Sequence, residues 1–382
     1  MGNNDNSFST SRRNFLATTG SVLGAALVAT NSASALAPAA TAASSTSAEM
    51  AAAMTACKLR KNPIGVFDPV YADLSIDQML DVVTGLGLEV MEIGTGGYPG
   101  NKHCALDDLI ADSTKAHAWQ RKFTDRGIRI TTLSCHGNPV HPDAAIAAHD
   151  ADTFRKTVLL AEMLEIKVIV GFSGCPGGTP ADRTPVWVTY PWPDEHKAAR
   201  TWGMKERLVP YWKGAAKFAR EHGVHKLALE MHPNFSVYNP RTLMQLREAV
   251  GEEIGANNDL SHLFWQQCNA VEVIRFLGKQ GALFHAHMKD TVIFPDNAAK
   301  YGVLNFATDA EDLPNASATF RAVGYGHSAA QWKDIMLAYM EVGYGGIFSI
   351  ENEDPILPGP VGVERAAYVL KNIRAEILGE KA

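Results

Sequence analysis

The sequence predicts an α/β domain in which eight strands and eight helices alternate to form a closed (β/α)8 barrel. From about residue 61 onward, short β-branched, apolar runs alternate with amphipathic stretches of helical period. Continuous apolar strands between helices are typical of a parallel sheet covered by helices. Eight such units in about 320 residues fit a barrel with long loops. No G-x-G-x-x-G follows the first strand, so the rival open dinucleotide-binding sheet lacks its fingerprint.

The order of elements follows from these runs. The eight expected strands are 64–67, 89–94, 128–137, 167–174, 226–232, 254–262, 283–290 and 346–354. The helix candidates between them include SIDQMLDVVTGLG, DTFRKTVLLAEMLE, LVPYWKGAAKFAREHG and AVEVIRFLGKQG, which end near a glycine or polar stop. Two connections are long, about 175–205 after the fourth strand and 291–326 after the seventh. Because both follow strand C-termini, we expect them to act as lids or substrate walls.

Composition restricts the classes of partner. The chain has 382 residues, a net charge of −6 and 46% hydrophobic residues, as in a soluble globular protein. This charge gives no electrostatic reason to expect nucleic acid or an anionic membrane as a partner. The five cysteines are scattered without a C-x-x-C pair, so neither a disulfide scaffold nor a zinc ribbon is expected. We therefore expect a small-molecule partner rather than nucleic acid or a membrane. A homo-oligomer is possible.

The N-terminal segment, residues 1–50, is expected to be a signal and a flexible small-residue stretch rather than part of the barrel. SRRNFLATTG, residues 11–20, resembles a twin-arginine export signal at every position of the Ser/Thr-Arg-Arg-x-Phe-Leu pattern. The apolar run behind it is short for a membrane span. We therefore expect one barrel over 51–382, exported to the periplasm or secreted, with no membrane partner after the signal is removed.

Ligand-type residues cluster at the ends of the last four expected strands. Successive strands end in Glu230 and His232, Asp259 and His262, His285 and His287, and Glu351 and Glu353. Strand ends meet around one axis in a closed barrel, and residues i and i+2 share a face. One such residue alone is more often structural or solvated, but four consecutive strands with this pattern predict a shared site.

The residue types predict one divalent metal ion. Two or three carboxylates with an imidazole form a mixed oxygen and nitrogen site, which suits Mn²⁺, Mg²⁺, Co²⁺ or Zn²⁺. Mn²⁺ is our first expectation. Clustered carboxylates repel one another, and a divalent cation relieves that repulsion.

At this point the sequence resembles a known family, the xylose isomerase-like TIM barrels, specifically the sugar phosphate isomerase/epimerase group, over about residues 60–378. The motifs that carry the resemblance are LALEMH, NNDLSHL, HMKD and FSIENED. The resemblance implies that the metal ligands are Glu230, Asp259, His287 and Glu351. The D-x-x-H spacing gives His262 a substrate-contacting or supporting place. LSCHGNPVHP and MEIG add His136 and Glu92 to the expected pocket.

Other residues receive weaker expectations. Lys289 is expected at the pocket rim, and Trp192 could stack on a sugar, although packing beneath long loops explains such tryptophans as well. His285 is expected to be a core histidine bonded to a backbone carbonyl. His103 is expected at the surface. His232 and Glu353 are expected to orient metal ligands.

Two positions depart from the sugar 3-epimerases of this family. Those enzymes carry a glutamate six residues after the first metal glutamate and an arginine six residues after the metal histidine. Here the two positions are Ser236 and Ile293. The contacts that grip the sugar must therefore differ, and a plain ketohexose 3-epimerase is in doubt.

The leading functional expectation is a metal-dependent sugar isomerase or epimerase. Glu230 and Glu351 would remove and return a proton next to a carbonyl, and the metal would stabilise an enediolate. The close rival is a lyase or hydrolase of 3-keto-glycosides with His136 or His262 as base, because an exported enzyme is expected to meet unphosphorylated substrates. An endonuclease IV-like nuclease and a non-catalytic carbohydrate-binding barrel are weaker alternatives.

Overall fold

A computed structural model describes residues 61–380 of the chain. The expected signal at residues 1–50 lies outside the described residues, so its assignment stays a prediction. Among residues 61–380, none of the helices combines the length and the hydropathy that a membrane crossing requires.

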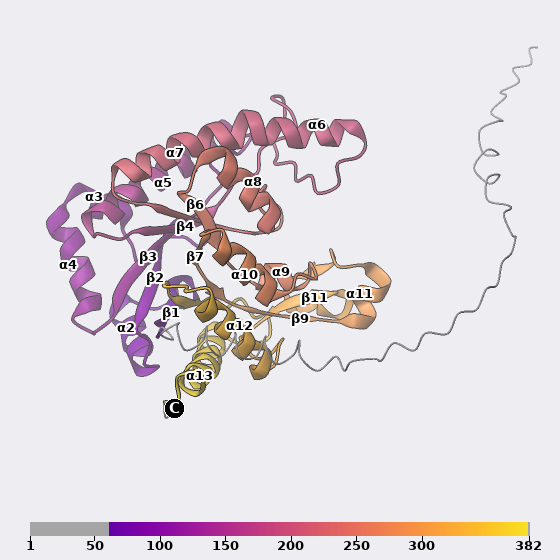
Figure 1. Ribbon diagram of the computed structural model, residues 1–382. Helices are drawn as coiled ribbons and strands as arrows, with labels where there is room; N and C mark the ends of the chain where they lie inside the picture. The colour runs from indigo at the N-terminus through magenta and orange to yellow at the C-terminus, as the bar shows by residue number, and fades with distance from the viewer. Residues whose placement is uncertain (1–60, 381–382) are drawn as a thin grey trace, which may run out of the picture. The chain divides into compact units, whose positions relative to one another are not determined.

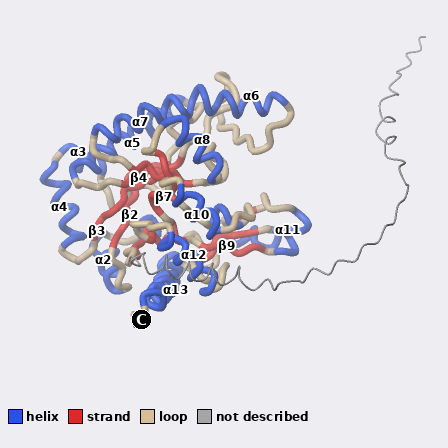
Figure 2. Tube along the Cα trace, viewed as in Figure 1, coloured by secondary structure: helices blue, strands red, loops and turns tan. Residues whose placement is uncertain are grey.

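The centre of the described domain is a barrel of parallel strands, which confirms the predicted fold (Figures 1 and 2). All eight predicted strand regions contain strand. The barrel strands are β1 (Ile64–Phe67), β2 (Val90–Gly97), β3 (Arg129–His136), β4 (Val168–Phe172), β5 (Lys226–Glu230), β6 (Ile254–Asn257), β7 (Leu283–His285), β8 (His287–Met288) and β12 (Phe348–Ile350).

The seventh predicted strand is divided into two segments that complete the barrel. β7 pairs with β6 on one side, and β8 pairs with β12 on the other, with only Ala286 between them. The β6–β7 register shifts, so that Asn257 lies opposite His285. This irregularity lies at the base of the candidate site and changes the side-chain alternation there.

Helices surround the strands, as Figure 2 shows in blue around red. They begin at side-chain caps where the sequence supplies them: Ser75, Asn239 and Ser328 each form a capping box at a helix N-terminus. The helices around the barrel are α2 (Ile76–Gly85), α3 (Leu106–Ala111), α4 (Ser113–Thr124), α5 (Ala144–Met163), α7 (Val209–Glu221), α8 (Pro240–Val250), α9 (Ser261–Phe264), α10 (Ala270–Lys279), α12 (Ala329–Glu341) and α13 (Gly359–Leu378).

Two excursions leave the C-terminal ends of the strands on the same side of the barrel (Figure 1). After β4, an irregular segment leads into α6 (Asp194–Trp202), and a π-helical turn at Gly203–Leu208 joins α6 to α7. After β8, a small separate sheet forms from β9 (Asp290–Ile293), β10 (Phe306–Ala307) and β11 (Ala318–Arg321). That excursion also carries α11 (Pro295–Tyr301) and a 3-10 helix at Ala310–Asn315, and a 3-10 turn at Asp68–Tyr71 follows β1.

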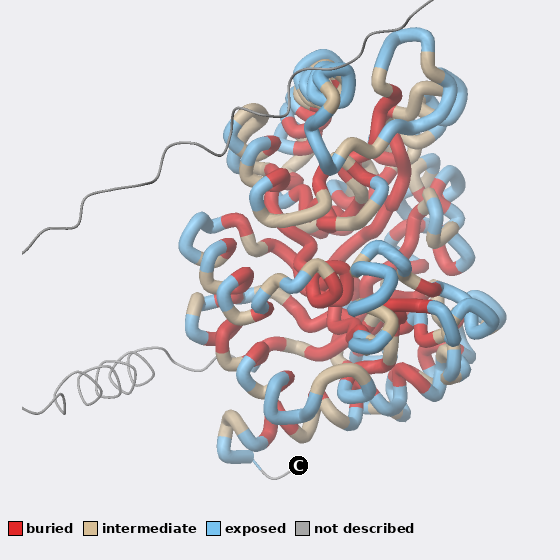
Figure 3. The backbone as a smooth tube through the Cα atoms, turned by 90° about the vertical axis from the view of Figure 1, so that its right-hand side faces the viewer, coloured by how far each residue is buried: buried red, intermediate tan, exposed pale blue. Residues whose placement is uncertain are grey.

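Buried residues fill the interior and the layer between strands and helices (Figure 3). Inside the barrel, Val170, Ala228 and Phe284 form a small apolar cluster of their own. Gly255 makes room for Phe284, because a Cβ at that position would overlap the aromatic ring. This apolar floor supports the polar groups at the strand ends.

Candidate metal centre

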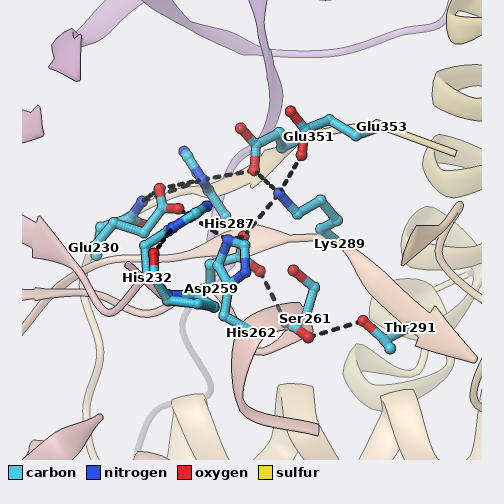
Figure 4. A network of polar contacts seen from close by, with 12 residues as sticks. Glu230, His232, Asp259, Ser261, His262, His287, Lys289, Thr291, Glu351 and Glu353 are labelled. Atoms are coloured by element: carbon cyan, nitrogen blue, oxygen red, sulfur yellow. Dashed lines mark hydrogen bonds and ion pairs between the residues drawn. The ribbon is translucent and has the colours of Figure 1, made fainter. Parts of the chain in front are cut away.

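Four side chains converge at the C-terminal end of the barrel. Each of them offers one ligand atom, and all four atoms lie within 4.8 Å of one another: Glu230, Asp259, His287 and Glu351. Glu230 ends β5, His287 begins β8, and Asp259 and Glu351 follow β6 and β12, so the four come from the strand regions that the sequence indicated. Figure 4 shows Glu230 and Glu351 on either side of His287. The structure therefore brings together the four residues predicted as ligands.

His287 presents its Nδ1 atom to this cluster. Its Nε2 lies 3.0 Å from Oε2 of Glu92, and its Nδ1 lies 3.1 Å from Glu351 Oε2 and 3.3 Å from Glu230 Oε2. A histidine ligand commonly donates its second ring N–H to a carboxylate, which fixes the ring orientation. Glu92 meets that requirement, so Nδ1 is the ligand atom that faces the cluster.

Glu92 is fully buried behind the candidate ligands and cannot reach a substrate. It accepts hydrogen bonds from Ser349 Oγ at 2.7 Å, from Ser134 Oγ, and from His285 Nε2 at 2.8 Å. Burial opposes its charge, but the imidazoles of His287 and His285 hold the pKa of Glu92 well below its usual range. An orienting contact with His287 thus replaces the substrate contact expected for Glu92.

Glu230 is surrounded by nitrogen atoms. Its Oε2 accepts from the Asn257 amide at 2.9 Å and lies 3.2 Å from His136 Nε2, while its Oε1 lies 3.1 Å from His262 Nε2. Although burial opposes ionisation, the hydrogen bonds from these imidazoles hold the pKa of Glu230 well below its usual range. The carboxylate is therefore charged and fixed in position.

Lys289 places an ammonium group beside the candidate ligands. Its Nζ lies 3.1 Å from Asp259 Oδ2, 2.7 Å from Glu351 Oε2 and 2.8 Å from Glu353 Oε2, as Figure 4 shows for the two glutamates. Burial would lower its pKa, but the surrounding carboxylates hold it well above the usual value. Glu351 and Glu353 share one face, as their i, i+2 spacing predicts.

The donor set fits a divalent cation. Asp259 Oδ2 is buried, and its partners are ion pairs with Lys289 Nζ at 3.1 Å and His262 Nε2 at 3.2 Å rather than hydrogen bonds. One oxygen from each of three carboxylates and one ring nitrogen lie within 4.8 Å of one another. A buried carboxylate oxygen without a hydrogen bond, in a mixed oxygen and nitrogen cluster, is the chemistry that Mn²⁺, Mg²⁺, Co²⁺ and Zn²⁺ accept.

A pocket of about 170 Å³ opens above the cluster to solvent. Its polar lining comes from Glu230, His136, His232, Lys289, Glu351, Asn352 and Glu353, and its apolar lining comes from Phe67, Pro69, Val70, Tyr98, Pro99 and Phe172. Pockets of this mixed character commonly hold small molecules. The pocket therefore gives a small ligand direct access to Glu230 and Glu351.

His232 differs from the other histidines near the cluster. Its Nδ1 donates to the carbonyl oxygen of Pro233 at 2.6 Å. In the neutral ring, Nε2 therefore carries no hydrogen and offers a lone pair. Burial, together with the nearby His262, lowers the pKa of His232 to about 3, so the ring is neutral at neutral pH. By contrast, the carboxylate of Asp259 outweighs the effect of burial and raises the pKa of His262 to about 9.

The structure places other predicted residues away from the pocket. Trp192 is 69% exposed on the excursion after β4 and does not line the pocket, so its substrate role stays a prediction. His262 lies buried beneath Glu230. Ser236 and Ile293 also lie outside the pocket lining, so neither of them takes over a sugar contact there.

Two contacts were missed by the sequence analysis. Asn257 bonds to Glu230 and lies 3.1 Å from His287 Nδ1, yet an asparagine within a strand gives no local signal. His285 is buried as expected, but it bonds to the carboxylate of Glu92 rather than to a backbone carbonyl.

The prediction that His103 is a surface residue is wrong. Its ring is buried, with Nδ1 2.6 Å from Asp68 Oδ2 and Nε2 3.1 Å from the carbonyl oxygen of Leu74. Asp68 also accepts from the Gly94 amide at 2.6 Å. The pair therefore joins the segment after β1 to the segment after β2, both of which supply residues to the pocket wall.

Comparisons with known proteins give the same fold. The chain is 34% identical over 300 residues to the uncharacterized protein YfiH of Bacillus subtilis (strain 168), covering 78% of this chain and 95% of that protein. An IolI protein solved with a bound zinc atom superposes with a TM-score of 0.56 at 17% identity, over 82% of this chain and 98% of that chain. A D-psicose 3-epimerase solved in the presence of D-fructose gives a TM-score of 0.52 at 16% identity, over 82% and 98%.

A family model also matches most of the described domain. It is the model of the Xylose isomerase-like TIM barrel, and it matches residues 80–373. That range contains Glu92 and all four converging ligand-type residues. The chain therefore belongs to the Xylose isomerase-like TIM barrel family.

Proposed function

We propose that this chain is a divalent-metal-dependent isomerase or epimerase that acts on keto sugars by moving a proton next to the carbonyl. The observation that carries the proposal is the convergence of Glu230, Asp259, His287 and Glu351 beneath an open pocket. Among proteins that share the fold, one is a D-psicose 3-epimerase and another, an IolI protein, was solved with a bound zinc atom, so the fold is compatible with an epimerase and with a metal site.

The four side chains would hold the ion through His287 Nδ1 and one oxygen from each of the carboxylates. When bound, a divalent cation would polarise a ketone and a neighbouring hydroxyl and stabilise the charge of an enediolate. We propose Mn²⁺ first, with Mg²⁺, Co²⁺ and Zn²⁺ as alternatives.

Glu230 and Glu351 are the proposed acid and base. Both line the pocket, and they lie on opposite sides of His287 Nδ1, at 3.3 and 3.1 Å. Hydrogen bonds from Asn257 and from the imidazoles of His136 and His262 hold the Glu230 carboxylate in position at the pocket lining, so it is oriented before a substrate binds. Return of the proton to the opposite face gives epimerisation, and return to the neighbouring carbon gives isomerisation.

The test is exchange of substrate protons with D₂O in metal-loaded enzyme. Glu230→Gln and Glu351→Gln keep side-chain size and remove the charge, and each should reduce deuterium incorporation about 100-fold or more, together with metal content. Glu248→Gln changes an exposed helix residue outside the pocket and serves as the control. Unchanged exchange in both site variants would refute the assignment.

Cleavage of 3-keto-glycosides is the second candidate. The observation that favours it is the pair of imidazoles, His136 and His232, that line the pocket next to Glu230. An imidazole base could remove a proton next to the ketone while the β-substituent leaves. Release of a free aglycone from a 3-keto-glycoside, with no epimer formed from a keto-hexose panel, would replace the first proposal by this one.

We also propose export to the periplasm or beyond the cell through the twin-arginine signal at residues 11–20. Changing Arg12 and Arg13 together to Lys preserves charge and should retain the protein in the cytoplasmic fraction. Export of this variant at the wild-type level would contradict the proposed route.

A further inference from the structure

Apart from the divalent ion proposed to bind at the floor of the pocket, the charges that a ligand can touch there are negative. Glu353 is the most exposed charged side chain of the pocket lining, with 56% of its side chain accessible, and Glu351 is 15% accessible. Among residues 61–380, the single lysine or arginine that lines the pocket is Lys289, which is only 1% exposed. An incoming ligand therefore meets carboxylates at the rim before it meets any cation of the protein.

Lys289 is surrounded by carboxylates. Its Nζ donates to Glu351 and Glu353 at 2.7 and 2.8 Å and forms an ion pair with Asp259 Oδ2 at 3.1 Å. The Phe320 ring covers the same group, with its centroid 4.4 Å from Nζ. A phosphate or carboxylate on a substrate could bind Lys289 only by displacing one of these carboxylates.

Part of the pocket lining is aromatic. Phe67, Phe172 and Tyr98 belong to it, and Tyr98 is 72% exposed. Aromatic faces pack well against the C–H face of a sugar ring. A lining that is partly carboxylate and partly aromatic therefore suits an uncharged, polyhydroxylated ring.

We infer that the pocket selects uncharged substrates and rejects anionic ones, and that Glu353 is the residue that sets this selectivity. Glu353 acts in two ways: it presents an accessible negative charge, and it occupies one hydrogen of Lys289. The substrate class is thus a neutral keto sugar or keto-glycoside without phosphate or carboxylate. This inference rests on the proposed function for its keto-sugar part, while the charge selectivity concerns binding alone. The charge selectivity does not depend on the cellular location of the protein.

The experiment compares D-fructose with D-fructose 6-phosphate in metal-loaded protein. Deuterium incorporation from D₂O is measured for both sugars, and calorimetry measures their binding. We expect the neutral sugar to be favoured about tenfold or more in kcat/KM and in affinity, because unit charges a few ångströms apart interact strongly in a partly buried site. Glu353→Gln keeps the shape, removes the charge and should reduce the preference severalfold. Glu248→Gln should leave it unchanged.

The two measurements separate the two proposals. Equal or tighter binding of the phosphate by the wild-type protein would overturn the charge inference, whatever the outcome of the exchange assay. A preference for the neutral sugar that Glu353→Gln leaves intact would overturn the role of Glu353. Absence of exchange into either sugar, combined with preferential binding of D-fructose, would refute the proposed reaction on this substrate and leave the charge inference supported.

Discussion

Oε2 of Glu92 lies 3.0 Å from Nε2 of His287, and this contact determines which ring nitrogen faces the candidate metal centre. The two residues are 195 positions apart and belong to β2 and β8. Ser349 and His285 hold the same carboxylate oxygen, so Glu92 has little freedom to turn away. The histidine is consequently aligned before any ion arrives.

The first prediction concerns this orienting contact. Glu92→Gln keeps the size of the side chain but removes the charge that aligns His287. We expect metal affinity to fall by about 10- to 100-fold, as for other carboxylates that orient histidine ligands. Titration calorimetry with Mn²⁺ or Zn²⁺ measures the metal affinity of the wild type and of the variant.

Glu89→Gln is the matched control, because Glu89 also lies near the start of β2 but bonds to Arg374 at 2.6 Å, outside the metal cluster. It should affect stability more than metal affinity. Equal losses of metal affinity in the two variants would contradict the role given to Glu92.

The second prediction is that metal binding releases protons. Burial would lower the pKa of His287, but the carboxylates of Glu92 and Glu351 raise it well above its ordinary value when no ion is bound. The ring is therefore protonated at pH 7, and Nδ1 must lose its proton before it can bind a metal. Apparent affinity should rise about tenfold per pH unit for each proton released.

Calorimetry in two buffers with different heats of protonation counts the released protons directly. We expect about one proton or more per ion at pH 7. Binding heats that do not depend on the buffer would show that His287 is already neutral, or that it is not a ligand.

The third prediction concerns the buried pair of His103 and Asp68. Burial opposes the imidazolium, but the hydrogen bond that His103 donates to Asp68 raises the pKa of His103 above its ordinary value. The stabilisation is therefore fully present below about pH 6.5 and is lost as pH rises through the folded-state pKa. His103→Gln should lower the free energy of unfolding by about 3–5 kcal/mol at pH 6 and by less at pH 9.

Denaturant unfolding at both pH values gives these free energies. His117→Gln is the control, since His117 is exposed and its ring bonds only to the carbonyl of Ser113. If His103→Gln lowers the free energy of unfolding by the same amount at pH 6 and at pH 9, protonation of His103 does not contribute to the stability of the pair.

The fourth prediction tests the apolar floor of the barrel. Gly255→Ala should destabilise the protein by about 1–3 kcal/mol, because the added methyl group overlaps the Phe284 ring. Gly85→Ala is the comparison, since a Cβ there meets no atom within 4 Å and the residue lies at the end of α2. Thermal unfolding measures both. Equal stability of the two variants would show that Phe284 can move aside.

Much of the fold was predictable because the apolar periodicity is local. Each of the eight strand regions carries its own short apolar stretch, and the i, i+2 rule correctly placed Glu351 and Glu353 on one face. The division of the seventh strand at Ala286 was not predictable, because it depends on pairing with β6 on one side and β12 on the other. Register between strands is a property of the closed sheet rather than of any single segment.

The candidate site shows the same limit. Strand-end position pointed to the last four strand regions, and the family resemblance implied Glu230, Asp259, His287 and Glu351 as the ligands among them. The structure brings all four together, although their roles stay predictions. Asn257 gave no signal, because its importance comes only from the neighbours that the barrel supplies. His103 sits in a polar segment, and its buried partner Asp68 is 35 residues earlier. Local polarity alone therefore placed it wrongly at the surface.

The proposed reaction depends on the last four strand regions holding one divalent ion. The most direct measurement is elemental analysis of freshly purified protein and of protein reloaded with Mn²⁺ or Zn²⁺, alongside Asp259→Asn with His287→Ala. We predict about one ion per chain in the wild type and a loss of at least about tenfold in affinity in the double variant. Wild-type protein that holds no stoichiometric ion in either state would contradict the account.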